Sequence, residues 1–352
     1  MQKSFDILTA LRGILALWVV FYHIQPNLYH LVGPWVNHTL SMGYVAVDFF
    51  FVLSGFVIAM TYQEQLSQSF SYRNLVSFYI KRIARIYPLH LAIMLLYLSL
   101  PVTFMLTGRD VPVVYDYQSY FTSLALVNNW GFHDTLTWNI PSWSISTEFS
   151  CYLLFPFIIL IINRLRSLSL LFLATIFSCS VIALLFSQKN ANNIGDYIPM
   201  LGIWRCIFEF ILGIVIFGLY REGHLYYFKG KYLFLGMVSI LAFSIAMNLK
   251  NYFWLPIFMM VFVSLMIFIE DNISVKVPKV LLWLGDISYS IYLGHYIIRD
   301  IMKLFLDTDQ ASLEWSMVYL FLVLLTSHLT YKFFELPAKK KMLCVFLPLV
   351  NK

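Results

Sequence analysis

The stretch ALRGILALWVVFYHI (residues 10–24) has the apolar content of a membrane-spanning helix, yet it carries Arg12 near one end and His23 near the other. Eleven positions separate these residues, and at about 100° per position they complete roughly three helical turns. Arg12 and His23 therefore share one helical face, about 16 Å apart along the axis. The sequence predicts a first span with a polar stripe that reaches two depths of the bilayer.

The composition of the whole chain is that of a membrane protein. Hydrophobic residues make up 60% of the 352 residues, charged residues make up 12%, and the mean hydropathy is +0.76. Runs long enough to cross about 30 Å of hydrocarbon predict ten spans, at residues 6–26, 44–62, 87–106, 142–163, 168–187, 199–220, 231–248, 252–269, 280–298 and 312–334. We therefore expect an all-α polytopic integral membrane protein, with residues 1–352 forming a single membrane-embedded domain.

The basic residues predict the orientation of these spans. Among the 24 Lys and Arg residues, Arg12 and Arg205 lie within spans. The loops on one side would hold only five others, Arg109, Lys189, Lys250, Arg299 and Lys303. The rest fall on the opposite side, which the positive-inside rule assigns to the cytoplasm together with both termini. The net charge of +6 is then expected to face the anionic headgroups of the bilayer, which leaves no need for a nucleic-acid partner.

The cysteines and the first apolar run exclude some other classes of site and segment. Cys151, Cys179, Cys206 and Cys344 have neither paired nor metal-ligand spacing, so they are expected to act as small apolar residues, and no metal site is expected. The first apolar run contains Arg12 and is expected to remain in the membrane as a signal anchor. We find no internal repeat and no linker.

Ionisable residues in other spans are costly in hydrocarbon unless they have a partner or face water. In GYVAVDFFFVLSGFVIAM (residues 43–60), Asp48 lies in the outer third of the predicted span and Ser54 lies near its middle. His23 is at a similar depth in the preceding span. The sequence predicts His23 as the partner of Asp48.

Two further segments bring polar groups to the same level. PSWSISTEFSC (residues 141–151) puts Ser144 and Glu148 on one helical face, and DISYSIYLGH (residues 286–295) puts Tyr289 and Tyr292 on one side with a histidine. Four helices thus offer ionisable residues at one depth, as in a buried catalytic or ion site: His23, Asp48, Glu148 and His295.

Several of these residues also have a purely structural interpretation. Arg12 can snorkel to the cytoplasmic headgroups, and His23 can be a packed interfacial histidine. In FYIKRIARIYPLH (residues 78–90), Arg82 and Arg85 lie three apart at the predicted entrance to the third span. That spacing suits phosphate oxygens, although the positive-inside rule alone also explains the pair. Arg205 and Glu209, four apart, are expected to form an internal ion pair.

The segment NNWGFHDTLTWNIPSW (residues 128–143) is rich in aromatic residues and amides. Flat rings beside amide groups suit stacking and hydrogen bonding on a sugar face, and they equally suit an aromatic belt at the membrane interface. The sequence leaves both interpretations open for its aromatic residues, Trp130, Phe132, His133, Trp138 and Trp143.

The order of these motifs resembles the acyltransferase 3 family of membrane-bound acyltransferases over nearly the whole chain. Arg12, ten residues and His23 match one family motif, and GxxxVDxFFxxSGF matches residues 43–56. The basic pair matches Arg82 and Arg85, WSxxxE matches residues 143–148, and SYxxYLxH matches residues 288–295. FFELP (residues 333–337) resembles the Phe-Glu-Lys/Arg-Pro ending of the family, with Leu336 in the place of the basic residue.

This resemblance implies transfer of an acyl group, usually acetyl, from cytoplasmic acyl-CoA to a hydroxyl of an extracytoplasmic or lipid-linked glycan, such as lipopolysaccharide O-antigen, in a bacterial inner membrane. Some family members carry a fused extracytoplasmic domain that completes the transfer. The chain ends at Lys352 without one, so it is expected to act alone or with a separate partner protein. Acetyl-CoA is the expected acyl donor, and no metal is expected.

The residues and the resemblance together assign separate roles in donor binding and in catalysis. Arg82 and Arg85 are expected to bind the phosphates of acyl-CoA at the entrance, and Arg12 to bind a phosphate or guide the pantetheine arm. His23 is expected to be the general base for the acceptor hydroxyl. Its ring would be oriented by a carboxylate, from Asp48 or Glu148.

Two mechanistic questions stay open from the sequence. The sequence does not decide which hydroxyl donates a hydrogen bond to the developing oxyanion. The candidates are those of Ser54, Tyr289 and Tyr292. An acyl-enzyme is an alternative to direct transfer, with His23, Ser54 and Cys151 as its candidate nucleophiles.

The rival functional class is a secondary transporter of an anionic solute, because intramembrane ionisable residues also form ion paths. The lack of a repeat between the two halves argues against that class.

Overall fold

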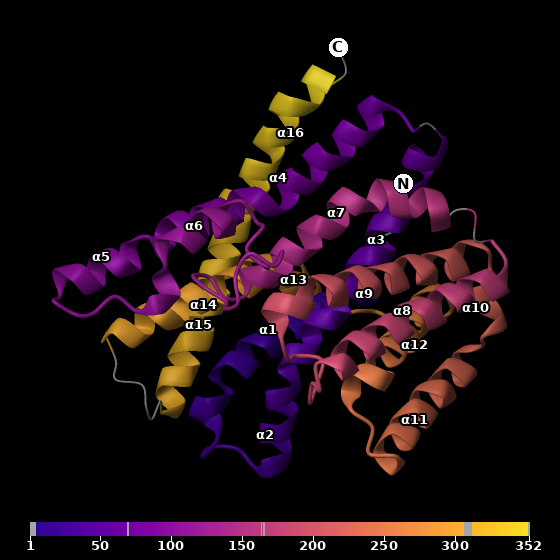
Figure 1. The fold of residues 1–352 in the computed structure, drawn as a ribbon, viewed down its shortest axis with the longest axis horizontal. Helices are drawn as coiled ribbons and strands as arrows, with labels where there is room; N and C mark the ends of the chain where they lie inside the picture. Colours follow the sequence, from indigo (N-terminus) through magenta and orange to yellow (C-terminus); the bar gives the residue numbers. More distant parts are fainter. Residues whose placement is uncertain (1–4, 69, 163, 165, 306–311, 351–352) are drawn as a thin grey trace.

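The computed structural model describes residues 5–68, 70–162, 164, 166–305 and 312–350, and within these ranges its regular secondary structure is entirely helical. The elements in chain order are α1 (Asp6–Leu28), α2 (Pro34–Ser41), η1 (Met42–Val45), α3 (Ala46–Gln68), α4 (Tyr72–Tyr97), α5 (Ser99–Leu106), η2 (Val113–Tyr115), α6 (Tyr117–Leu124), α7 (Ser142–Ile162), α8 (Leu168–Gln188), α9 (Ile198–Arg221), α10 (His224–Tyr227), α11 (Gly230–Ala246), α12 (Asn251–Asn272), α13 (Lys279–Asp286), α14 (Ser288–Phe305), α15 (Leu313–Thr330), η3 (Tyr331–Glu335) and α16 (Leu336–Val350). Figure 1 shows their arrangement, with α16 running beside α4.

Eight helical segments in the described ranges are long and apolar enough to cross a membrane. They are Asp6–Pro26, Pro34–Ser67, Tyr72–Leu106, Ser142–Ile161, Leu168–Gln188, Ile198–Arg221, Asn251–Asn272 and Leu313–Val350. The predicted all-α polytopic architecture is therefore confirmed. The predicted third span begins at Tyr72 rather than at residue 87, because the basic stretch continues the helix that Ser71 caps by accepting a hydrogen bond from the Asn74 amide.

The remaining two predicted spans differ from ordinary membrane helices. The span predicted at residues 231–248 is the shorter apolar helix α11. The span predicted at residues 280–298 is divided at Ile287 into α13 and α14. The α14 helix carries Arg299, Asp300 and Lys303, which lower its hydropathy, but its inner face is buried against other helices and is not exposed to lipid.

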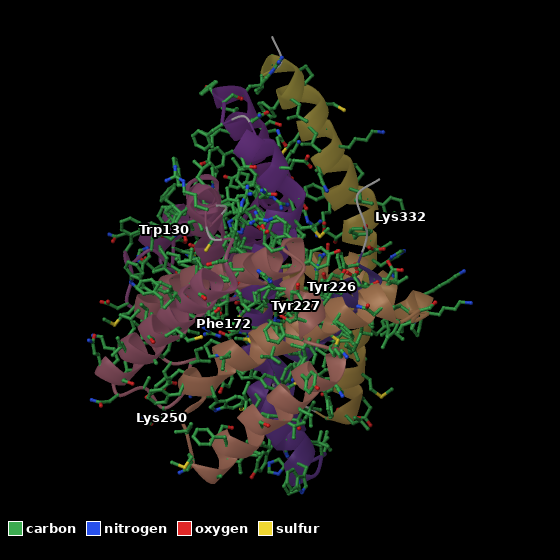
Figure 2. The ribbon with its side chains drawn as sticks, turned by 90° about the vertical axis from the view of Figure 1, so that its right-hand side faces the viewer. Trp130, Phe172, Tyr226, Tyr227, Lys250 and Lys332 are labelled. Carbon is green, nitrogen blue, oxygen red and sulfur yellow. The ribbon has the colours of Figure 1, made fainter. Side chains whose placement is uncertain are left out.

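Exposed aromatic and aliphatic side chains cover the outside of the bundle. Figure 2 shows Phe172, Tyr226 and Tyr227 among the side chains on this surface, and Tyr227 is 78% exposed. In water such a surface is a liability, whereas in a bilayer it faces the acyl chains and the interface. This surface agrees with an integral membrane protein.

Two glycines allow α3 and α9 to cross in close contact near the middle of the bundle. A Cβ atom on Gly55 would lie 2.0 Å from the Phe210 carbonyl oxygen, and one on Gly213 would lie 2.0 Å from the Val52 carbonyl oxygen. Small residues permit this backbone approach in membrane helices. The crossing determines which side chains of α3 and α9 face each other.

We expect Gly213→Ala to destabilise the protein by about 1–3 kcal/mol, because the added methyl group would force the two backbones apart. The measurement is the thermal unfolding midpoint of the purified protein in detergent. Gly236→Ala in α11 is the matched control, since its Cβ position meets no heavy atom of another described segment within 4 Å. Equal midpoints for the two variants would contradict the close crossing.

The start of α1 is anchored to the end of α12. The backbone amides of Asp6 and Ile7 donate to the carboxylate of Glu270 over 2.9 and 2.6 Å. A carboxylate at a helix N-terminus satisfies free N–H groups and is favoured by the helix dipole. This anchor fixes the axial position of α1, which carries Arg12 and His23.

Candidate active site

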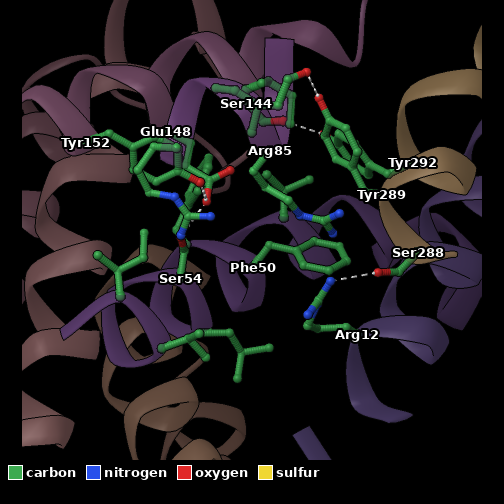
Figure 3. Close-up of a pocket in the computed structure, with 18 residues that line it drawn as sticks. Arg12, Phe50, Ser54, Arg85, Ser144, Glu148, Tyr152, Ser288, Tyr289 and Tyr292 are labelled. Atoms are coloured by element: carbon green, nitrogen blue, oxygen red, sulfur yellow. Dashed lines mark hydrogen bonds between the residues drawn. The ribbon is translucent and has the colours of Figure 1, made fainter. Parts of the chain in front are cut away.

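A first cavity, which we name the arginine cavity, lies between α1, α3, α4, α7 and α14 (Figure 3). Its volume is about 170 Å³, and its charged lining residues are Arg12, Arg82, Arg85 and Glu148. The three guanidinium groups come from two helices that are far apart in sequence. Because three cations face one carboxylate, the cavity favours an anionic ligand.

Arg12 reaches this cavity from the middle of α1. Its Nη2 atom donates a hydrogen bond to Ser288 Oγ over 3.2 Å at the start of α14. No carboxylate lies within 4 Å of Arg12 in the described part of the chain. Its charge is therefore held by a neutral hydroxyl and stays available to a ligand.

Arg82 and Arg85 lie inside α4, one turn apart, and they differ in their partners. Arg85 forms an ion pair with Glu335, whose second oxygen accepts a hydrogen bond from Ser290 Oγ over 2.8 Å. The Arg82 guanidinium lies over the rings of Tyr152 and Tyr62, at 5.2 and 5.7 Å. Arg85 is thus positioned by a carboxylate, and Arg82, which has no carboxylate partner among the described residues, lies over aromatic faces.

Glu335 is a site residue whose role the sequence did not reveal. It is 2% exposed and lies in η3, the π-helical turn that joins α15 to α16. In the sequence it belongs to the FFELP segment. Because Leu336 replaces the basic residue of the family's ending, the role of the preceding carboxylate could not be assigned from the motif. The structure shows that this carboxylate holds Arg85 in the cavity wall.

Glu148 also lies in the arginine cavity and not beside His23. Its Oε1 atom accepts hydrogen bonds from Ser54 Oγ and from the hydroxyl of Tyr152, the latter over 2.6 Å. The predicted pairing of Glu148 with His23 therefore differs from the structure. Tyr152 lies one turn further along α7, and Ser54 reaches the carboxylate because α3 and α7 meet at this level.

A second cavity, which we name the histidine cavity, lies further along α1. Its volume is about 340 Å³, and its lining includes His23, Tyr22, Tyr44, Trp143, Asp196 and Arg205. Volumes of this order are typical of small-molecule sites. The lining mixes hydroxyls, an imidazole, aromatic faces and a carboxylate, which suits a ligand rich in hydroxyl groups.

The two cavities meet at Tyr292. This residue and Val47 line both of them. The Tyr292 hydroxyl lies 2.6 Å from Ser144 Oγ, and both hydroxyls lie near the Pro141 carbonyl oxygen, at 3.3 and 3.1 Å. Figure 3 shows this pair at the edge of the arginine cavity. The boundary between the two chambers is therefore formed by Tyr292, with its hydrogen bond, and by Val47.

Asp48 has a different partner from the predicted one. It is fully buried and forms a two-pronged ion pair with Arg205, at the level set by the α3–α9 crossing. The predicted pair of Arg205 with Glu209 is wrong, and both Glu209 carboxylate oxygens lack a hydrogen-bond partner among the described residues. A fork-shaped guanidinium matches a facing carboxylate better than one on its own helix. Asp48 therefore does not orient His23.

His23 is surrounded by rings and by one cation. Its ring centroid lies 5.2 Å from that of His295, 5.1 Å from Tyr296 and 5.0 Å from Tyr22. The Arg299 guanidinium reaches the backbone carbonyl oxygen of His23 over 3.5 Å. Of the four residues predicted at one depth, the structure brings His23 and His295 together and places both carboxylates elsewhere.

The hydroxyl of Tyr289 is also hydrogen-bonded, to a backbone carbonyl. Its hydroxyl donates to the Ile86 carbonyl oxygen over 2.5 Å, and its ring lies under the Arg85 guanidinium at 5.3 Å. Tyr289 therefore joins α14 to α4 beside the arginine cavity. Among the three residues considered for the oxyanion, only Tyr292 lines both cavities.

The aromatic residues of the segment at residues 128–143 divide into two groups. Trp138 is fully buried and donates from Nε1 to the Asp116 carbonyl oxygen over 2.7 Å, and Trp130 donates to the Ser146 carbonyl oxygen over 3.0 Å. The ring of Trp138 packs inside the fold, whereas that of Trp130 is half-buried. His133 bonds the Thr122 hydroxyl over 2.6 Å. Trp143 is the aromatic residue of this segment that lines the histidine cavity.

Two of the four cysteines agree with a packing role. Cys151 and Cys206 are buried with their Sγ atoms 3.5 Å apart, across the contact of α7 and α9. Neither lines the arginine cavity or the histidine cavity. This placement disfavours Cys151 as a nucleophile.

Known proteins place this architecture in one family. The family described as an acyltransferase domain matches residues 5–332, which is most of the chain. The chain belongs to the acyltransferase 3 family. The resemblance predicted from the five motifs is confirmed, and the protein is a membrane acyltransferase.

Two relatives of this acyltransferase indicate the breadth of the family. The acyltransferase MdmB of Streptomyces mycarofaciens is 29% identical over 317 residues, which cover 83% of the chain and 78% of MdmB. The O-acetyltransferase OatA of Staphylococcus aureus (strain NCTC 8325 / PS 47) is 24% identical over 89% of the chain and 55% of OatA. The chain thus spans about half the length of OatA. No solved structure matches this acyltransferase.

Proposed function

We propose that this acyltransferase transfers an acetyl group from acetyl-CoA to a hydroxyl of an extracytoplasmic or lipid-linked glycan, in a bacterial cytoplasmic membrane. The observation that carries the proposal is the pair of chambers on α1, one lined by arginines and the other by His23, which meet at Tyr292. A donor that is charged at one end and an acceptor rich in hydroxyls require two such environments.

The arginine cavity is the proposed donor site. Acyl-CoA carries several phosphate charges at one end and its thioester at the tip of a long uncharged arm. Arg82 and Arg12, which have no carboxylate partner among the described residues, would bind phosphate oxygens or the polar groups of the arm. The positive-inside rule assigns this end of α4 to the cytoplasm, where acyl-CoA is present.

The histidine cavity is the proposed acceptor site. His23 lines it beside Trp143 and several hydroxyl groups. A neutral imidazole can remove the proton of an acceptor hydroxyl as the oxygen attacks the thioester carbonyl. The ring of Trp143 offers a flat apolar face to a sugar.

Tyr292 lies where the thioester would meet the acceptor. Its hydroxyl hydrogen-bonds with Ser144, and the residue lines both chambers. A hydroxyl donor at this point would stabilise the negative charge that develops on the thioester oxygen. Direct transfer needs no protein nucleophile in this arrangement, and Ser54 is already hydrogen-bonded to Glu148.

The test of this function is mass spectrometry of envelope glycans from cells that express the wild type, combined with thermal unfolding of the purified protein with acetyl-CoA. We expect a glycan whose mass increases by one acetyl group in place of a hydrogen, and a higher unfolding midpoint with acetyl-CoA. If the glycans carry no added acetyl group and acetyl-CoA does not shift the midpoint, the proposed donor and acceptor are contradicted.

We expect Arg12→Ala to raise the KM for acetyl-CoA by about 10–100-fold, because a charged hydrogen bond contributes about 1.5–3 kcal/mol. The measurement is acetyl transfer in membrane vesicles at increasing acetyl-CoA concentration. The matched control is Arg166→Ala, since Arg166 is exposed on a loop away from the arginine cavity. An unchanged KM in Arg12→Ala would exclude Arg12 from the donor site.

A further inference from the structure

We infer that His295 is the positioning residue of His23, and that the two histidines form a dyad in place of the predicted histidine–carboxylate pair. The inference rests on the proposed function, in which His23 is the general base. It concerns which group orients the His23 ring and shares its proton.

The protonation of His295 is set by its own helix. His295 is fully buried in α14, and its Nδ1 atom lies 2.7 Å from the Tyr292 carbonyl oxygen and 3.1 Å from the Ile291 carbonyl oxygen. A carbonyl oxygen only accepts hydrogen bonds, so Nδ1 carries the hydrogen. The Nε2 atom of neutral His295 is then an acceptor with a free lone pair.

That lone pair has no partner within the described part of the chain. His295 Nε2 is buried and forms no hydrogen bond there. A buried acceptor without a donor is costly, and it marks a position where a hydrogen bond is expected to form. The site therefore lacks one N–H donor next to His295.

His23 is the neighbour that can supply this donor. The two ring centroids are 5.2 Å apart. Two imidazoles joined edge to edge by an N–H···N bond of about 3 Å also have their centroids about 5 Å apart, so a rotation of the His23 ring is sufficient. His23 would then donate one N–H to His295 and present the lone pair of its other nitrogen to the histidine cavity.

The charges around the two rings favour this neutral arrangement. The Arg299 guanidinium lies 3.5 Å from the His23 carbonyl oxygen and 3.8 Å from the Tyr296 ring centroid, and Arg299 pairs with Asp300 over 3.4 Å. A nearby cation disfavours a resting imidazolium, so His23 keeps the lone pair that a base needs. The Tyr319 hydroxyl donates to the His295 carbonyl oxygen over 3.1 Å and holds this turn of α14 in place.

The dyad gives a balanced transfer step. The acceptor oxygen forms a bond to the thioester carbon while its proton moves to the free nitrogen of His23. His295 Nε2 accepts a hydrogen bond from the opposite N–H and so shares the positive charge that develops. When the carbon–sulfur bond breaks, His23 returns the proton to the CoA sulfur, and both histidines are again neutral.

Two substitutions of His295 separate this role from packing. Asparagine places an amide nitrogen near the position of Nδ1, so it can keep the bonds to the backbone carbonyls, but it has no atom at the position of Nε2. Glutamine places an amide oxygen near the position of Nε2. We expect His295→Asn to lower kcat by about 10²-fold with an unchanged KM for acetyl-CoA, and His295→Gln to recover most of that loss.

The opposite ranking, with asparagine active and glutamine inactive, would leave His295 a structural role only. A second comparison covers the case in which both variants lose activity. In a His23→Ala background, His295→Asn should cause no further loss, because the partner through which it acts is gone. An equal loss in both backgrounds would overturn the inference. An inactive wild type would instead overturn the proposed function itself.

Discussion

Replacing His23 by alanine is expected to lower the rate of acetyl transfer by about 10²–10⁴-fold, because the acceptor hydroxyl would lose its general base. Binding of acetyl-CoA should persist, since Arg12, Arg82 and Arg85 lie in a different cavity. The measurement pairs acetyl transfer in vesicles with the shift of the unfolding midpoint caused by acetyl-CoA.

The control for this variant is His30→Ala, because His30 is exposed just beyond the end of α1 and does not line the histidine cavity. It should keep wild-type activity. Activity within about threefold of the wild type in His23→Ala would remove His23 from the chemistry. Failure of His23→Ala to accumulate in the membrane would instead assign it a structural role.

Replacing Asp48 by alanine is expected to destabilise the protein by about 3–5 kcal/mol, because it leaves the Arg205 guanidinium buried without its partner. Arg205 is 2% exposed and Asp48 is fully buried, so the pair is shielded from bulk solvent. The measurement is the amount of folded protein after detergent extraction, together with its unfolding midpoint. We expect little folded protein from this variant.

Removing both charges should restore folding. The double variant Asp48→Leu with Arg205→Met replaces the ion pair by apolar side chains, and such replacements are often neutral. Glu222→Ala is the control, because the side chains of its ion pair, Arg221 and Glu222, are 22% and 28% exposed. Such a pair should contribute no more than about 1 kcal/mol to the free energy of unfolding. A stable Asp48→Ala variant would contradict a buried, unscreened Asp48–Arg205 pair.

Much of the architecture could be predicted from the sequence because it depends on local composition. Long apolar runs can satisfy their backbone groups in hydrocarbon only as helices, so the helical class followed directly from hydropathy. The same rule misjudged the start of α4 and the break at Ile287. Charged residues such as Arg82 and Arg299 lower hydropathy wherever they occur, whereas in the structure both are half-buried between helices.

The stripe on α1 was also predictable, because helical periodicity decides which residues share a face. Arg12 and His23 do lie on one helix at two levels, and each lines a cavity. Periodicity does not say that these are separate cavities, or that Tyr292 from α14 stands between them. That arrangement depends on where a helix distant in sequence packs.

The sequence by itself determined that this chain is a helical membrane protein with the motifs of an acyltransferase, because both follow from residue type and local spacing. The tertiary structure alone decided the partners. It joined Asp48 to Arg205, Glu148 to Ser54 and Arg85 to Glu335, and it placed the His23 ring beside that of His295. Partner choice depends on which helices lie opposite each other, and close crossings such as that at Gly55 and Gly213 set this through long-range packing.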